Sequence, residues 1–167
     1  MENKKKIRAK AGDVFQIPID EIHISFGQVC ENNGGVLRVI TFNKIYSTTI
    51  IPQITEIIQS NIVLLTDTMD AKIYNGDWQV VGNAPVITNL PMPKFKFGID
   101  PVYITEYGSK TTRIATPEEA EKLDFQFSVS PIRVQNAMQA YFKRKEWEAD
   151  YDKLTYQYCE DKALIEL

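Results

Sequence analysis

The side chains of this chain that could carry chemistry are few and far apart in sequence. Its one histidine, His23, lies between two isoleucines, so histidine-assisted nucleophilic catalysis and a multi-histidine metal site would both depend on one imidazole. A structural role on a sheet is favoured for His23. The sequence contains no Cys-x-x-Cys pair, no Gly-x-Ser-x-Gly elbow and no glycine-rich phosphate loop. We therefore expect no catalytic residue, no metal site and no bound cofactor.

Three aspartates each lie at a turn beside a predicted strand, where paired carboxylates could act as general acid and base. They are Asp13, Asp77 and Asp100. Turn chemistry is the favoured interpretation of all three, because a short carboxylate can hydrogen-bond to nearby backbone and fix a turn. An enzyme that gathers Asp77, Asp100 and Arg113 in one cleft stays open as an alternative.

Other residues are better suited to recognition than to catalysis. The forked guanidinium of Arg113 could bind a carboxylate or phosphate, or could hold its own hairpin in place. Trp78 is predicted to be a core residue that anchors a sheet to a helix, although tryptophan and arginine are also the residues that dominate interface hot spots. As candidate partner-binding residues we take Asp77, Trp78, Asn83 and Arg113.

Composition limits the classes of protein that fit. The chain has 167 residues and a formal net charge of -3, from 19 basic and 22 acidic residues, which argues against a generic nucleic-acid binder. A basic start, with Lys4, Lys5, Lys6 and Arg8, keeps a nucleic-acid-binding small β-barrel as the second hypothesis. We expect a cytoplasmic protein without a membrane span, in which Cys30 and Cys159 are reduced thiols that fill space.

Hydrophobic patterning predicts the elements that must position these residues. Gly12 to Pro85 should hold an antiparallel meander, a short helix and a tryptophan-bearing strand, and a proline-stiffened linker should follow. The later part should add a hairpin to the same sheet, a helix with a Thr116–Glu119 capping box, a core helix and a charged C-terminal helix. The predicted strands cover 14–19, 22–30, 36–42, 62–65, 102–107 and 110–114, and a further short strand lies within 76–85 between two turn clusters. Residues 66–70 are predicted as a polar connection, and the predicted helices cover 47–60, 116–123, 130–142 and 147–158.

These elements predict an α+β fold: a curved, mostly antiparallel sheet, SH3-like or a small barrel in its N-terminal part, with flanking helices and a C-terminal helix. We expect a basic tail over 1–10, one domain over 11–142 and a helical extension over 143–167. The extension either folds back on the domain or mediates self-association.

Four separated motifs together resemble one known family. They are Gly12-Asp13-Val14-Phe15-Gln16-Ile17-Pro18-Ile19, Phe26-Gly27-Gln28-Val29, Gly76-Asp77-Trp78-Gln79-Val80-Val81-Gly82-Asn83-Ala84-Pro85, and Arg113-Ile114-Ala115-Thr116-Pro117-Glu118-Glu119. In order and spacing they resemble the immunity protein 26 family of bacterial polymorphic toxin systems, from about Ala11 to Phe142.

The resemblance implies an α+β protein made beside a secreted or contact-delivered toxin. Such a protein binds its cognate toxin in the producing cell and neutralises it by occlusion, without catalysis. The matched residues would mark the shared fold, while the toxin-contacting surface varies around it. The function expected from sequence is therefore that of an immunity protein in interbacterial competition, with a protein toxin as its partner.

Overall fold

The computed structural model describes residues 6–106 and 111–167. They form two compact units. Unit 1 takes in the described chain up to Ile87 together with Ser128–Tyr156, and unit 2 takes in Thr88–Phe127 and Gln157–Leu167, as far as these are described. The basic residues Lys4 and Lys5 and the predicted hairpin turn at Gly108-Ser109 lie outside the described residues.

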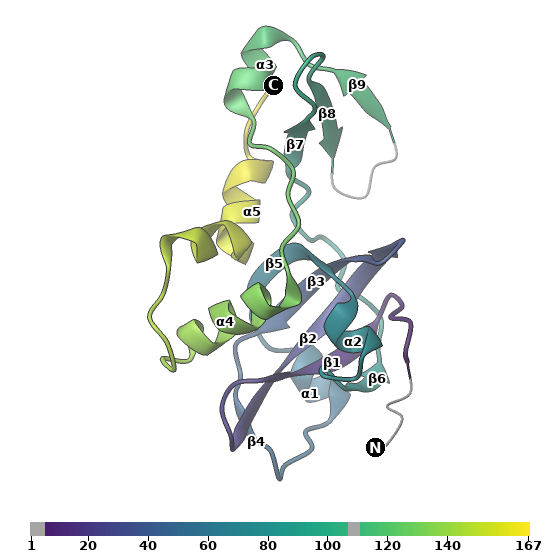
Figure 1. Ribbon diagram of the computed structural model, residues 1–167, viewed down its shortest axis with the longest axis vertical. Coiled ribbons are helices and arrows are strands. Elements are labelled where there is room, and N and C mark those ends of the chain that lie inside the picture. Colours follow the sequence, from purple (N-terminus) through teal and green to yellow (C-terminus); the bar gives the residue numbers. More distant parts are fainter. Residues whose placement is uncertain (1–5, 107–110) are drawn as a thin grey trace. The chain divides into compact units, whose positions relative to one another are not determined.

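Unit 1 is built on one antiparallel sheet with the order β5-β3-β2-β1-β6, and β4 pairs with the start of β2 (Figure 1). Its strands are β1 (Asp13–Pro18), β2 (His23–Asn33), β3 (Val36–Phe42), β4 (Tyr46–Ser47), β5 (Ile62–Met69) and β6 (Val80–Asn83). Irregularities of register interrupt three of the pairings, between β1 and β6, between β2 and β3, and between β3 and β5. Such bulges bend a sheet. The predicted α+β class with an antiparallel meander is confirmed, but β5 and β6 do not pair, so the described sheet is open and forms no closed barrel.

One face of this sheet is covered by α4 (Pro131–Tyr141), which buries Val134, Ala137, Met138 and Ala140. The hydroxyl of Thr41 on β3 donates to the Met138 sulfur at 3.0 Å. Gly27 makes room for the ring of Phe15, because a Cβ at this position would lie 2.5 Å from Phe15 Cζ. Gly27 is therefore a point of close packing between β2 and β1.

The other helices of unit 1 are short. They are α1 (Ile54–Ile58), α2 (Ala71–Tyr74) and the 3₁₀ helix η1 (Ala149–Leu154). The predicted helix over 47–60 is wrong in its first half, because Ser47 belongs to β4 and residues 48–53 form turns and irregular backbone. Pro52 disfavours the helical conformation for the residue before it, so the helix begins only after the N-cap Gln53.

The predicted polar connection over 66–70 is also wrong, because β5 continues to Met69 and most of its polar side chains are buried. Thr68 Oγ1 donates to the Val129 carbonyl at 2.8 Å, and Asp67 pairs with Arg38 on the neighbouring strand at 3.3 Å. Each polar group thus has a partner, which removes much of the cost of burial. Desolvation still raises the pKa of the Asp67 carboxyl, against the opposing effect of Arg38.

Unit 2 contains a separate three-stranded sheet in the order β7-β8-β9, so the prediction that one sheet continues through this region is wrong. Its elements are β7 (Lys94–Phe97), β8 (Tyr103–Glu106), β9 (Thr112–Ile114), α3 (Pro117–Lys122) and most of α5 (Tyr156–Ala163). The pairing of β8 with β9 confirms the predicted hairpin. Asp124 accepts a hydrogen bond from Tyr158 Oη and pairs with Lys162, both at 2.7 Å, and so attaches α5 to this unit.

The predicted continuous helix over 147–158 is broken. Tyr151 and Leu154 are buried, as expected for the apolar face of that helix, but they lie on η1, and Thr155 is extended before α5 begins.

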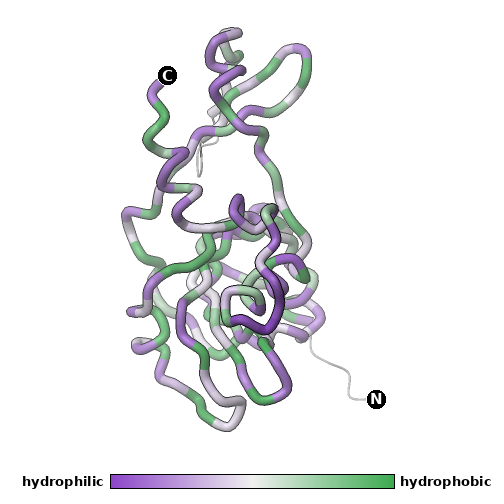
Figure 2. The backbone as a smooth tube through the Cα atoms, turned by 90° about the vertical axis from the view of Figure 1, so that its left-hand side faces the viewer, coloured by the Kyte–Doolittle hydropathy of each residue, from purple (hydrophilic) through white to green (hydrophobic). Residues whose placement is uncertain are grey.

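Hydrophobic and hydrophilic stretches alternate along the whole described backbone (Figure 2). None of the helices in the described residues has the length and apolar character needed to cross a membrane.

Candidate partner-binding surfaces

Trp78, one of the four candidate residues, lies in the core of unit 1 with 1% of its surface exposed. Its ring stacks on Phe15 of β1, with centroids 5.1 Å apart and planes 9° apart. Its indole N–H donates to Gln135 Oε1 on α4 at 3.0 Å. The burial supports the predicted role of Trp78 as the anchor between sheet and helix.

Asp77 and Asn83 flank this anchor at the surface. Asp77 is exposed in the turn after α2, where its backbone N–H and that of Trp78 both donate to the Lys72 carbonyl. Asn83 Nδ2 donates to the Ala11 carbonyl at 3.1 Å and to Asp13 Oδ1 at 3.0 Å. The amide of Asn83 therefore stabilises the turn that opens β1.

Arg113 lies on β9 and makes a bidentate pair with Glu119, at 2.8 and 2.7 Å. Glu119 also accepts from the Thr116 N–H, while Thr116 Oγ1 accepts from the Glu119 N–H, so the predicted capping box is confirmed. The Arg113 hydrogen bond, and next the Thr116 N–H, lower the pKa of Glu119 to about 2. Arg113 thus fastens β9 to the first turn of α3.

The candidates do not form a single cluster within one unit: Asp77, Trp78 and Asn83 belong to unit 1, and Arg113 and Asp100 belong to unit 2. Asp13 is buried and bonded to the Lys10 N–H and to Asn83, as a turn aspartate should be. In the described part of the chain, no group of three or more histidine, cysteine, aspartate or glutamate side chains could hold a metal ion. Cys30 and Cys159 form no disulfide, and burial raises the pKa of Cys30 to about 12.

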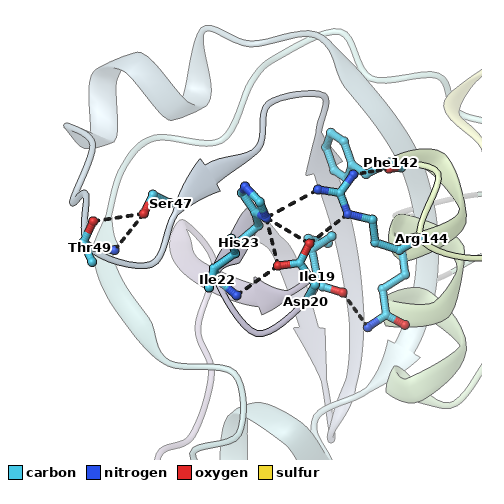
Figure 3. A network of polar contacts seen from close by, with 9 residues as sticks. Ile19, Asp20, Ile22, His23, Ser47, Thr49, Phe142 and Arg144 are labelled. Carbon is cyan, nitrogen blue, oxygen red and sulfur yellow. Dashed lines mark hydrogen bonds and ion pairs between the residues drawn. The ribbon is translucent and has the colours of Figure 1, made fainter.

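Sequence reasoning missed a polar network at the turn between β1 and β2 (Figure 3). The Asp20 carboxylate bonds His23 Nδ1 at 2.8 and 2.9 Å, the Ile22 N–H at 3.0 Å and Arg144 Nε at 2.8 Å. The Arg144 hydrogen bond, above all, holds the pKa of Asp20 well below its usual range. The network joins the turn to the end of α4.

Arg144 reaches this position because α4 ends in a left-handed residue. Lys143 has φ of 64°, its N–H donates to Ala140, and the Arg144 N–H donates to Gln139. This pairing is a Schellman motif, which turns the chain sharply after a helix. A left-handed lysine has no strong sequence signature, so the network was not predictable from residue types.

Three exposed isoleucines lie beside this network, and we call them the isoleucine patch: Ile22, Ile50 and Ile51, exposed by 62%, 55% and 85%. The backbone places them in adjacent segments, because the Thr48 N–H donates to the Ile22 carbonyl and the Ile50 N–H donates to Ser47. In the loop that carries Ile50 and Ile51, the Thr49 N–H donates to Ser47 Oγ at 3.3 Å, and the Ser47 and Thr49 hydroxyls share a hydrogen bond at 2.9 Å (Figure 3). Exposed aliphatic side chains on neighbouring backbone segments are candidates for the apolar centre of a protein contact.

The open sheet, the second small sheet and the helices define an α+β protein. The sequence profile of the family described as Immunity protein 26 matches residues 10–102, and the chain belongs to this family. The match covers the first three motifs that suggested the resemblance, whereas the motif from Arg113 to Glu119 lies beyond it. Searches of curated proteins and of solved structures returned no significant match.

Proposed function

We propose that this protein binds a cognate bacterial toxin in the cytoplasm of the cell that produces it and blocks the toxin by occlusion, without catalysis. The observation that carries the proposal is membership of the Immunity protein 26 family over residues 10–102. The alternative of a nucleic-acid-binding small barrel has less support, because the described sheet is open and the formal net charge is -3.

The isoleucine patch is the surface of unit 1 best suited to this contact. Large aliphatic side chains exposed by more than half lose water when a partner covers them, at about 25 cal/mol per Å² of apolar surface. The pairing of β4 with β2 and the Asp20–His23–Arg144 network hold the patch in place, so less conformational entropy is lost on binding. Asp77 and Asn83 stay proposals as further contacts at the surface, and Trp78 is proposed to act through the fold.

Co-expression with the toxin domain encoded in the neighbouring gene tests the proposal. We expect the wild-type chain to restore growth and to co-purify with the toxin as a stable complex. Survival without any physical complex would contradict the occlusion mechanism.

The role of the patch is tested by Ile51→Asp, which places a charge at its most exposed position. We expect at least about tenfold weaker toxin binding, since a charged group in an apolar contact stays desolvated without a partner. The matched control is Ile132→Asp, because Ile132 is also an exposed isoleucine of unit 1 but lies on α4. Full binding by Ile51→Asp would remove the patch from the interface.

A further inference from the structure

In each sheet, the backbone of one edge strand is hydrogen-bonded to a segment that lies outside the sheet. In unit 1, β5 is covered by Val129, whose N–H donates to the Asp67 carbonyl at 3.0 Å. In unit 2, β7 is covered by residues 124–126, because the Lys96 N–H donates to Asp124 at 3.0 Å and the Gln126 N–H donates to Lys96 at 2.8 Å. Among the described residues no strand pairs with the outer edges of β6 and β9.

The edge of β6 is unsuited to pairing with another strand. Its register with β1 shifts by one residue, so that Val81 has no partner, and Pro85 follows shortly after the strand. The Ala84 N–H donates to the Gly12 carbonyl, and the Gln16 N–H donates to the Gln79 carbonyl. The backbone polar groups of residues 84 and 79 therefore face β1. The backbone N–H and C=O groups that point away from β1 then belong to Val80 and Asn83, which are three residues apart. In a regular edge strand, these groups point outward at every second residue. Bulges of this kind protect sheet edges.

The edge of β9 is regular. Its register with β8 runs without a shift through Tyr103–Ile114, Ile104–Arg113 and Thr105–Thr112. The Ala115 N–H donates to the Val102 carbonyl at 2.8 Å, which makes residues 115 and 102 a hydrogen-bonded pair. Because such pairs alternate along an antiparallel ladder, Arg113 faces β8, whereas Thr112 and Ile114 direct their N–H and C=O groups outward.

This outward edge is exposed and held in place. β9 is the outer strand of its three-stranded sheet (Figure 1). All three of its residues are exposed, Ile114 by 62%, and Arg113 fixes the strand to α3 through Glu119. The Ile114 carbonyl accepts a long hydrogen bond from Arg113 Nη1 at 3.4 Å, whereas no strand among the described residues pairs with the outward N–H groups of Thr112 and Ile114. A fixed, regular edge of this kind is the template to which an extended peptide adds as a further strand.

The charge of the chain indicates the kind of strand that fits. Residues 1–87 and 128–156 contain equal numbers of basic and acidic residues, so the whole excess of acidic residues lies in the parts of the sequence that form unit 2. On α3, directly after β9, Glu118 pairs with Lys122 and Glu119 pairs with Arg113, so the charge that favours a partner is the net acidic excess of this unit as a whole. A basic partner strand would meet complementary charge in that excess.

We propose that β9 pairs with an extended strand of the cognate toxin, and that this strand carries lysine or arginine side chains. The inference rests on the proposed function, since it names one contact of that complex. β9 lies beyond the residues that match the family, so this contact would serve recognition of the particular toxin, alongside the isoleucine patch.

Proline substitution tests the backbone contact. Ile114→Pro and Thr112→Pro each remove an outward N–H that β8 does not use, and proline is tolerated on an edge strand when its nitrogen faces solvent. We expect roughly tenfold weaker binding of the toxin domain for each variant, as for one lost hydrogen bond that leaves its partner unsatisfied. Ile114→Thr, which keeps the N–H, and Val80→Pro, on the protected edge of β6, should bind like the wild type.

Hydrogen exchange on the wild-type chain gives a readout that does not depend on any variant. We expect the Thr112 and Ile114 amides to exchange freely in the chain alone and to be protected in the complex. Binding should also weaken at high salt, as complementary charge requires.

The outcomes separate the two proposals. If the wild-type chain forms no complex with the toxin domain, the proposed function fails. If the complex forms while the proline variants bind fully and both amides exchange freely, only the β9 inference fails. Self-association of the chain that is lost in Ile114→Pro, with toxin binding unchanged, would likewise overturn the inference, because a second copy would then occupy the edge.

Discussion

The indole of Trp78 links three elements of unit 1 that are far apart in sequence. It lies just before β6, stacks on Phe15 of β1 and donates to Gln135 of α4. Removing it would leave a cavity between the sheet and its covering helix, and would leave Gln135 without this donor.

We expect Trp78→Ala to lower the free energy of unfolding by about 3–5 kcal/mol, as for other buried aromatic residues. Denaturant unfolding measures the loss. The control is Trp147→Ala, because Trp147 is 39% exposed and packs against Tyr151 near the surface. A Trp78→Ala protein that keeps its stability but loses its toxin would place Trp78 in the interface instead.

Residue types predicted the role of Trp78 but not the network around Asp20. A large aromatic residue between two turn clusters indicates a core position with few alternatives. Asp20 and Arg144 are separated by 124 positions in sequence, and their contact depends on the left-handed conformation of Lys143. Arg113 was predictable only in part. Its residue type indicates a bidentate contact, but the sequence indicates Glu119 only as a member of the capping box and not as the partner of Arg113.

At the scale of elements, one carboxylate at the start of α3 makes two stabilising interactions. Glu119 completes the capping box and holds Arg113 of β9, so its charged form stabilises the junction of strand and helix.

The lowered pKa of Glu119 predicts a pH dependence with a definite sign. Its folded pKa of about 2 lies below the ordinary value of 4.5, so its contribution to stability is complete above pH 4.5 and is lost as the pH falls toward 2. The stability difference between the wild type and Glu119→Gln should therefore shrink over this range. Carbon-detected NMR of the Glu119 carboxyl should show a midpoint near 2. A midpoint close to the ordinary value would mean that the pair with Arg113 does not form in solution.

Local patterns predicted most of the strands and failed where burial overrode them. β1, β2 and β3 followed from apolar alternation. β5 was predicted too short because Thr66, Asp67 and Thr68 are polar, and only the tertiary partners Arg38 and Val129 make their burial favourable. The division into two sheets was not predictable either, since strand order depends on long-range pairing rather than on local sequence.

At the scale of the whole molecule, unit 1 is made of two separated pieces of chain. Residues 128–156 supply α4, the edge contact with β5 and the bridge between Thr155 and Leu64. The family match ends before these residues begin, at position 102.

We expect a fragment of residues 1–102 to fail to fold cooperatively, because it lacks the helix that covers Trp78 and that places Met138 over Thr41. A second fragment, in which a flexible Gly/Ser linker joins residues 1–88 to 128–156, should instead unfold in one cooperative transition. Circular dichroism during thermal unfolding compares the two. A stably folded 1–102 fragment would show that the second piece is dispensable.

The distance along the chain between Trp78 and Gln135 also sets a waiting time during synthesis. The two residues are 57 positions apart, and at about 5–20 residues per second a ribosome needs roughly 3–11 s to cover that interval. The sheet strands therefore leave the ribosome ahead of the helix that will cover one of their faces, by about this interval. The nascent chain must keep that apolar face from aggregating until α4 arrives, so the speed of translation between β6 and α4 becomes part of how efficiently the protein folds.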